Sequence, residues 1–122
     1  MSSSLITVVY KWTAHPGKLD ELKAIYQGVM DAMQQNEPGA AAAHCYVSEQ
    51  ENALYVRDEF QDAGALGFHL GNTAAAHFQQ LLAIATPGPF WFFGDVPEEM
   101  QQATRQMGLQ AEFAPRVFGF DR

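Results

Sequence analysis

Two histidines, His69 and His77, lie eight positions apart in the segment GFHLGNTAAAHFQ (67–79). Imidazole is a common metal ligand and general base, so the pair could do chemistry. On one continuous helix, at about 100° per residue, the two side chains would point about 80° apart. Gly71 and Asn72 instead favour a break, with Gly71 ending one helix and Asn72 capping the next. No cysteine or carboxylate completes a ligand set at the usual spacing, so the sequence predicts no metal site.

A second group of polar side chains belongs to two expected strands, 42–48 and 53–60. By alternation, His44 and Tyr46 share one face of the first strand, and Tyr55 and Arg57 share one face of the second. If the strands pair in antiparallel fashion, these four side chains form a polar floor. The alternative is a sheet surface that faces solvent or a second subunit, because sequence alone does not determine the register.

Three further reactive groups are expected to be inert. Asp58 and Glu59 are consecutive on the strand 53–60, so alternation places them on opposite faces and they do not form a catalytic pair. An exposed charge is the expected role of each. The single cysteine, Cys45, excludes an internal disulfide, and no neighbouring base in the sequence would activate its thiol.

Composition limits the classes of function. The 122 residues include 7 Lys plus Arg and 14 Asp plus Glu, and the net charge of −7 repels nucleic-acid phosphates and anionic lipid. No apolar run approaches the roughly 18 residues of a membrane span, and the N-terminus lacks the pattern of a signal peptide. We therefore expect a cytoplasmic protein with one domain over residues 1–122 and with no nucleic-acid or membrane partner.

The hydrophobic periodicity predicts the elements that position these side chains. Apolar residues alternate along 5–14, and they recur at spacings of three and four along 19–36. The expected strands are 5–14, 42–48, 53–60, 89–93 and 110–118, and the expected helices are 19–36, a broken helical stretch over 61–85, and a helix from Pro97 to Gly108. Pro115 places the final strand at an edge. This order indicates an α+β sheet with its helices on one face.

The other face of this sheet also carries large apolar side chains. Exposing a cluster of residues such as Tyr10, Trp12, Trp91 and Phe93 would cost several kcal/mol, or roughly 10 with generous areas. A second subunit is the simplest cover for such a surface. We therefore expect a homodimer in which sheet packs on sheet.

Several segments carry a resemblance to a known family. They are VVYKWTAHPGKLDELKAIY, the turn Glu37-Pro38-Gly39, YVRDEFQDAGALGFHL and NTAAAHFQQLLA. Over about residues 5–94 the chain resembles the antibiotic biosynthesis monooxygenase-like family of the dimeric α+β barrel superfamily, and about 95–122 looks like a helix–strand extension of some relatives. The resemblance implies a ferredoxin-like antiparallel sheet with helices on one face, two subunits forming the dimeric α+β barrel.

Relatives in this family include monooxygenases that form quinones without metal or flavin, as well as haem-degrading enzymes. In the monooxygenases the substrate anion itself reduces oxygen, so the protein supplies an apolar pocket, a base and hydrogen-bond donors. Phe60 stands where the family usually has a Trp, which removes an indole donor. Haem degradation is not expected, because 5–14 has no Asn and His69 lies where those enzymes have a Trp. The expected cofactor is none.

His69 matches the family's helical histidine, and we take it as the candidate base or anion-orienting donor, with Arg57 as an electrostatic partner. The alternative for His69 is a half-buried core histidine. The residues expected to bind substrate are Trp12, Tyr10, His44, Tyr46, Tyr55, Phe60, Asn72 and Trp91, although strand aromatics are often core and Asn72 also suits a helix cap.

The leading hypothesis is a cofactor-independent, monooxygenase-like oxidoreductase that binds a small aromatic or polyketide-like molecule. One alternative is a non-catalytic dimer, either a ligand-binding or a stress-related module, whose own aromatic residues fill the cavity. A third reading is an isomerase or decarboxylase that uses the same pocket.

Overall fold

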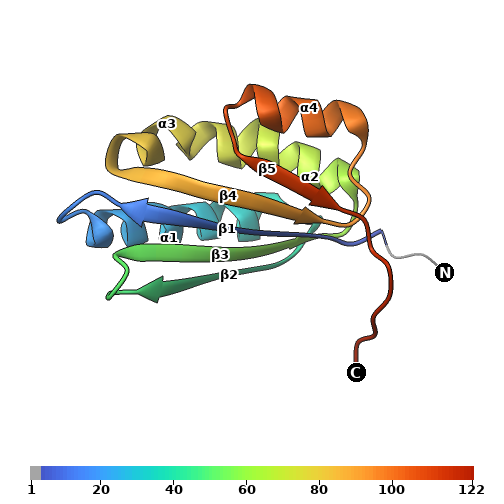
Figure 1. Ribbon diagram of the computed structural model, residues 1–122, viewed down its shortest axis with the longest axis horizontal. Helices are drawn as coiled ribbons and strands as arrows, with labels where there is room; N and C mark the ends of the chain where they lie inside the picture. Colours follow the sequence, from blue (N-terminus) through green and yellow to red (C-terminus); the bar gives the residue numbers. More distant parts are fainter. Residues whose placement is uncertain (1–3) are drawn as a thin grey trace.

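Five strands form a single sheet in the order β2-β3-β1-β4-β5 in the computed structural model, which describes residues 4–122. The elements are β1 (Ile6–Ala14), α1 (Leu19–Asn36), β2 (Ala40–Ser48), β3 (Ala53–Phe60), α2 (Ala63–His69), a π-helical turn (Leu70–Ala74), α3 (Ala75–Ile84), β4 (Ala85–Phe93), α4 (Glu98–Gln106) and β5 (Ala111–Ala114). The first four strands pair in antiparallel fashion, and β5 runs parallel to β4. All four helices lie on one side of the sheet (Figure 1), so the predicted α+β arrangement is confirmed.

Alternation along the central strand β1 separates the two faces of the sheet. Ile6, Val8, Tyr10 and Trp12 are buried toward the helices, while the residues between them face the other way. The expectation that Tyr10 and Trp12 lie with Trp91 on the uncovered face is wrong, because the register of β1 on β4 pairs Trp91 with Val9. Helix α1 packs on this buried face through residues spaced three and four apart, which are Leu22, Tyr26, Val29 and Met33. The core therefore lies between the sheet and the helices.

The turn Glu37-Pro38-Gly39 brings α2 close to the end of α1. A Cβ at Gly39 would lie 2.5 Å from the Cβ of Ala65, so only glycine allows helix α2 to approach this closely. Helix α2 begins at Asp62, whose carboxylate accepts a hydrogen bond from the backbone N–H of Ala65 at 2.8 Å. These contacts bring His69, on α2, close to Glu37.

The predicted helix break at Gly71 is absent. Helix α2, the π-helical turn and α3 follow one another without interruption from Ala63 to Ile84. Gly71 has no positive φ, and Asn72 caps no helix, because its Nδ2 donates to the carbonyl of Phe68 at 2.8 Å. Burial of the apolar face against the sheet outweighs the local cost of about 1 kcal/mol for a helical glycine.

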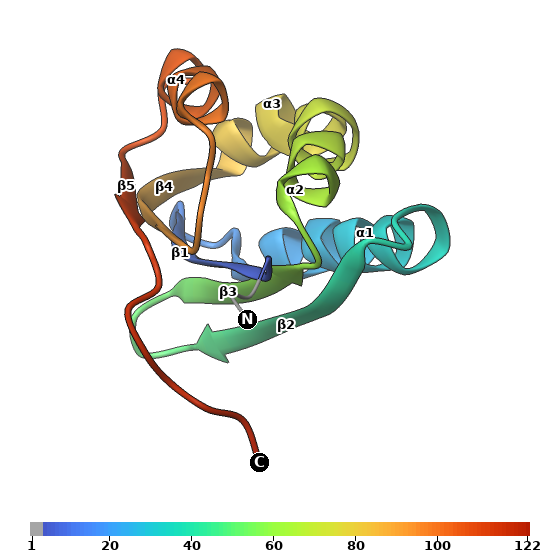
Figure 2. The same cartoon turned by 90° about the vertical axis from the view of Figure 1, so that its right-hand side faces the viewer.

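The C-terminal segment differs in extent from the prediction. Strand β4 begins at Ala85 instead of near residue 89, and β5 covers only Ala111–Ala114 instead of 110–118. β5 is an edge strand, as expected, and Pro115 directly follows it. Residues 115–122 then run past the face of the sheet that carries no helix (Figure 2). Over the described residues, no helix is long and apolar enough to cross a membrane.

Candidate functional site

A cavity of about 50 Å³ lies between the helix-covered face of the sheet and helices α1 to α3. By the measure in which one water needs about 10–15 Å³, this space holds a few water molecules. Most of its wall is apolar, formed by Val8, Trp12, Val29, Phe60, Leu66, Leu70, Ala74, Phe78, Leu81, Phe90 and Phe92. Met107 and Leu109, from the C-terminal helix–strand extension, complete the wall.

The polar side chains of the cavity form a directed hydrogen-bond chain. The indole Nε1 of Trp12 donates to the hydroxyl of Tyr26 at 2.8 Å. The Tyr26 hydroxyl donates to that of Tyr10 at 3.3 Å, and the Tyr10 hydroxyl donates to Oδ2 of Asp58 at 3.1 Å. Because an indole N–H can only donate, the chain runs in one direction and ends on the carboxylate.

Asp58 is buried, with 1% of its surface exposed, and the expectation of an exposed charge at this position is wrong. Alternation along β3 places Asp58 on the helix side with Val56 and Phe60, and it places Glu59 on the other side. Burial raises the pKa of Asp58 to about 6, although the charge of His69 and the hydrogen bond from Tyr10 oppose this shift. Its Oδ1 has no hydrogen-bond partner within the described part of the chain.

His69 forms a buried pair with Glu37. Its Nδ1 lies 3.0 Å from Oε2 and 3.2 Å from Oε1 of Glu37, and the two residues are 6% and 4% exposed. Burial raises the pKa of Glu37, but hydrogen bonds from His69 and Thr73 and the charge of His69 lower it below its ordinary value overall. An ionised carboxylate only accepts, so Nδ1 carries a proton and Nε2 is the ring nitrogen available to a ligand.

His77 also lines the cavity, which the predicted helix break did not suggest. His69 and His77 are eight positions apart, and the π-helical turn lies between them. One α turn of 3.6 residues plus one π turn, which has about one residue more, also spans about eight residues, so the two side chains point to the same side of the helix. Nδ1 of His77 donates to the carbonyl of Thr73 at 2.8 Å. No group of three His, Cys, Asp or Glu residues suited to a metal ion occurs between residues 4 and 122.

The cavity brings together four of the residues predicted from sequence, which are Tyr10, Trp12, Phe60 and His69. Another five lie on the opposite face of the sheet, which are His44, Tyr46, Tyr55, Arg57 and Trp91. Asn72 is exposed on the π-helical turn, outside the cavity lining.

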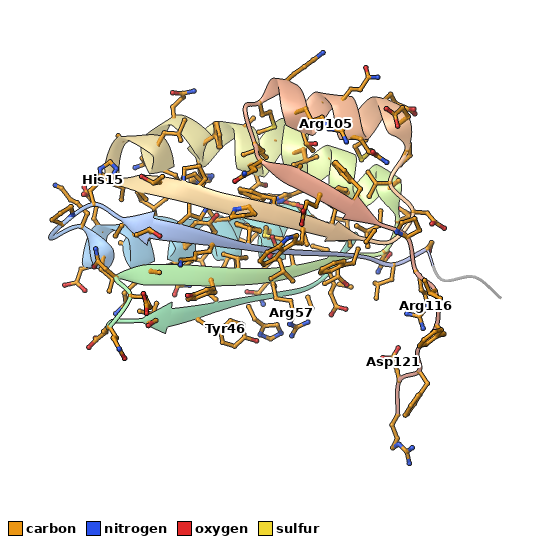
Figure 3. All side chains as sticks on the ribbon, in the orientation of Figure 1. His15, Tyr46, Arg57, Arg105, Arg116 and Asp121 are labelled. Atoms are coloured by element: carbon orange, nitrogen blue, oxygen red, sulfur yellow. The ribbon has the colours of Figure 1, made fainter. Side chains whose placement is uncertain are left out.

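The polar floor does form, on the face away from the helices. His44 pairs with Arg57 and Tyr46 with Tyr55 across β2 and β3. Figure 3 shows Tyr46 and Arg57 pointing away from the helices. Arg57 contacts Glu59, with Nη1 3.1 Å from Oε1, so it does not contact His69 as the expected electrostatic partner.

Sequence reasoning missed three polar residues of the cavity wall, which are Tyr26, Asp58 and His77, and it missed Glu37, the partner of His69. Tyr26 lies in the apolar stripe of α1, and Asp58 is a charge at an apolar position of an alternating strand. Both patterns were visible in the sequence. Glu37 follows the end of a helix, and its contact with His69 spans 32 positions, so no local pattern indicates it.

Comparison with known proteins identifies the class. The family model for antibiotic biosynthesis monooxygenases matches residues 5–81, and the chain therefore belongs to this family. The sheet order and the helices on one face agree with the ferredoxin-like α+β fold of its members. No curated protein matches the sequence.

Solved structures share the fold at low identity. MupZ from Pseudomonas fluorescens superposes with a TM-score of 0.80 and 16% identity, covering 98% of this chain and 96% of MupZ. SnoaB from Streptomyces nogalater, a cofactor-independent oxygenase, gives a TM-score of 0.66 and 18% identity, covering 78% of this chain and 96% of SnoaB. Rv0793 from Mycobacterium tuberculosis gives a TM-score of 0.67 and 17% identity, covering 78% of this chain and 98% of Rv0793. The coverage of MupZ extends over the C-terminal helix and strand.

Proposed function

We propose that the protein is a cofactor-independent monooxygenase whose substrate enters the cavity and whose base is His69. The single observation that carries this proposal is the buried His69–Glu37 pair at the wall of an apolar cavity. A carboxylate on Nδ1 holds the imidazole in the tautomer that leaves Nε2 free to accept a proton. Membership of the family and the likeness to SnoaB support an oxygenase at the family level.

The chemistry requires a substrate that becomes electron-rich when it loses a proton. A phenol or enol gives up its O–H proton to Nε2, and the resulting anion donates electrons to O₂, which is the oxidant. Carbon–oxygen bond formation then gives a peroxide anion, which takes the proton back from Nε2. The hydroperoxide loses water, with the hydrogen of the carbon that bears it, and leaves a carbonyl product. The apolar wall raises the free energy of the anion, and the Nε2–H that forms on His69 is the hydrogen-bond donor that stabilises it.

The size of the cavity bears on the substrate. About 50 Å³ is well below the few hundred Å³ of sites for drug-sized ligands, so a ring must move part of the wall. Met107 is flexible and unbranched, which makes it suited to such a movement. We infer a small, single-ring or short-chain substrate.

A proton-transfer enzyme such as an isomerase is the second candidate. The specific observation is that two acid–base groups, His69 and Asp58, line the same cavity. One group can take a proton from a small substrate while the other returns one elsewhere. Such an enzyme would turn over its substrate under nitrogen, whereas the proposed oxygenase requires O₂.

We also propose that the face of the sheet without helices packs on a second copy. This face carries Trp91, Tyr46 and Phe93, which are 39%, 53% and 44% exposed. Aromatic side chains on one face are typical of a subunit interface.

Oxygen uptake tests the proposed function. Wild type is assayed with small phenols and 1,3-diketones, and any substrate is repeated with His69→Ala and with the control His15→Ala, an exposed histidine in the turn after β1. We expect His69→Ala to lower turnover by about 10²-fold or more, since general bases contribute 10²–10⁴-fold, and His15→Ala to leave it unchanged. Unchanged oxygen uptake in His69→Ala overturns the role of His69, and turnover under nitrogen favours the isomerase.

A further inference from the structure

Asp58 lines the cavity, and its Oδ1 is a buried oxygen with no hydrogen-bond partner among residues 4–122. Buried polar atoms in native proteins are nearly always hydrogen-bonded, and leaving a carboxylate oxygen unpaired costs free energy. The side chain lies on β3, in the wall of the cavity. A molecule in the cavity that donates a hydrogen bond would satisfy this oxygen.

The hydrogen-bond chain leaves Oδ1 as the open position. Trp12 donates to Tyr26, Tyr26 donates to Tyr10, and Tyr10 donates to Oδ2 of Asp58. Because each hydroxyl proton of this chain is already directed at the next acceptor, neither tyrosine has a free donor for a ligand. Any proton that Asp58 itself carries must sit on Oδ1, on the cavity side.

The charges around Asp58 select against anions. No lysine or arginine lines the cavity within the described residues. The titratable groups near Asp58 are Tyr10 on β1, Tyr26 on α1, Glu37 after α1, Cys45 on β2, Arg57 on β3, His69 on α2 and His77 on α3. Arg57, the one cation in this set that is always charged, faces the other side of the sheet and pairs with Glu59. A carboxylate or phosphate in the cavity would lie near two acidic groups, with only histidines as a counter-charge.

We propose that Asp58 is a substrate-recognition residue, whose Oδ1 accepts a hydrogen bond from the hydroxyl group of a neutral and otherwise apolar substrate. The inference rests on the proposed function in one respect, because it takes the cavity as the substrate site. It adds the residue that recognises the neutral hydroxyl form of the phenol or enol, before His69 takes the proton, and it excludes carboxylates and phosphates. It also assigns a task to a residue that the proposed oxygenase chemistry of His69 leaves unused.

A pair of probes of similar shape tests this assignment. Phenol carries a hydroxyl group where toluene carries a methyl group. Binding of each compound to the full chain is followed by NMR titration, and benzoate serves as the anionic probe. We expect wild type to bind phenol at least about tenfold more tightly than toluene, the usual effect of a hydrogen bond to a charged group, and not to bind benzoate.

Asp58→Asn changes the group that meets the ligand. The amide oxygen remains as the acceptor for Tyr10, so the NH₂ group faces the cavity and donates where Oδ1 accepted. We expect the preference for phenol over toluene to fall below about twofold in this variant. The control is Glu59→Gln, the adjacent carboxylate on the opposite face of β3, which should keep the wild-type ratio.

A second measurement needs no substitution. The ¹³C resonance of the Asp58 carboxyl in wild type should shift when phenol is added and stay in place with toluene. The assignment is wrong if wild type does not bind phenol, or if Asp58→Asn keeps the phenol preference of wild type. Either result leaves the oxygenase proposal standing, because that depends on oxygen uptake by His69→Ala. Conversely, a phenol preference without any oxygen uptake supports the recognition residue and counts against the oxygenase.

Discussion

Two buried carboxylates, Asp58 in the cavity wall and Glu37 paired with His69, have pKa values that their surroundings shift in opposite directions. Hydrogen bonds from His69 and Thr73 more than offset the burial of Glu37, so its pKa is lowered and it stays ionised. Asp58 has a hydrogen bond only on Oδ2, and burial raises its pKa to about 6. Pairs of titratable groups separated in this way often mark acid–base sites in enzymes.

The raised pKa of Asp58 predicts a pH dependence of stability. The ordinary value is 3.8 and the folded value is about 6, so the stabilising effect of a protonated Asp58 is complete below about pH 4 and is lost as the pH rises through about 6. A shift of about two units corresponds to about 3 kcal/mol in the free energy of unfolding. Asp58→Asn lacks this titration. We therefore expect wild type to lose about 2 kcal/mol of this relative to Asp58→Asn between pH 4 and pH 7.

Urea denaturation at several pH values measures this difference. The lowered pKa of Glu37 acts with the opposite sign, because its stabilising effect is lost as the pH falls, but it is present in both proteins and cancels. Glu59→Gln serves as the control and should follow wild type. A difference between wild type and Asp58→Asn that does not change with pH would mean that Asp58 titrates near its ordinary value.

Alternation along a strand predicts which residues share a face. It does not predict whether a face that carries a charged residue points to the core or to solvent. Asp58 was assigned to solvent because charged side chains are rarely buried, although Val56 and Phe60 on the same face indicated the core. The same alternation correctly grouped Tyr55 with Arg57, and the register of β2 on β3 then completed the floor with His44 and Tyr46. His69 was identified through its match to a family pattern, not through its spacing from His77.

At the scale of elements, the continuous path from α2 to α3 shows tertiary packing overriding local signals. Gly71 favours the end of one helix and Asn72 the start of another, yet both residues lie inside the π-helical turn Leu70–Ala74. The other elements were predicted well, because β1 and α1 have strong and unambiguous periods of two and 3.6 residues. The exact ends of β4 and β5 depend on pairing partners that are distant in sequence.

Substitution of two glycines by alanine distinguishes a helical Gly71 from a helix-ending one. Gly71 has no positive φ and no atom within 4 Å of a Cβ position, so Gly71→Ala should stabilise the protein by about 0.5–1 kcal/mol. Gly108 ends α4 with φ +83° and is equally uncrowded, so Gly108→Ala should destabilise by about 1 kcal/mol through backbone strain alone. Thermal unfolding measures both, and destabilisation by Gly71→Ala would restore the predicted helix break.

At the scale of the whole molecule, the two faces of the sheet have different tasks. The helix-covered face holds the cavity and its acid–base groups, whereas the other face presents exposed aromatic side chains from β2 and β4. The C-terminal tail, residues 115–122, runs past the same side of the sheet (Figure 2), and its Val117, Phe118 and Phe120 are all exposed. An isolated chain would leave these apolar groups in water, which is the physical reason to expect a second copy.

Light scattering tests the sheet-on-sheet dimer, with wild type expected at twice the chain mass of 13.5 kDa. Trp91→Glu places a charge on the exposed face and removes an aromatic whose burial contributes about 3 kcal/mol, so dimerisation should weaken by about 10²-fold or more. The matched control is Leu82→Glu on α3, an exposed apolar residue on the helix side, and this variant should remain dimeric.

Thermal unfolding gives a second measurement of the dimer. The unfolding temperature of wild type should rise with protein concentration and that of Trp91→Glu should not, because only an associating protein is stabilised by mass action. A wild-type mass of 13.5 kDa at micromolar concentration would contradict the dimer and leave the exposed aromatic face without a second copy to cover it.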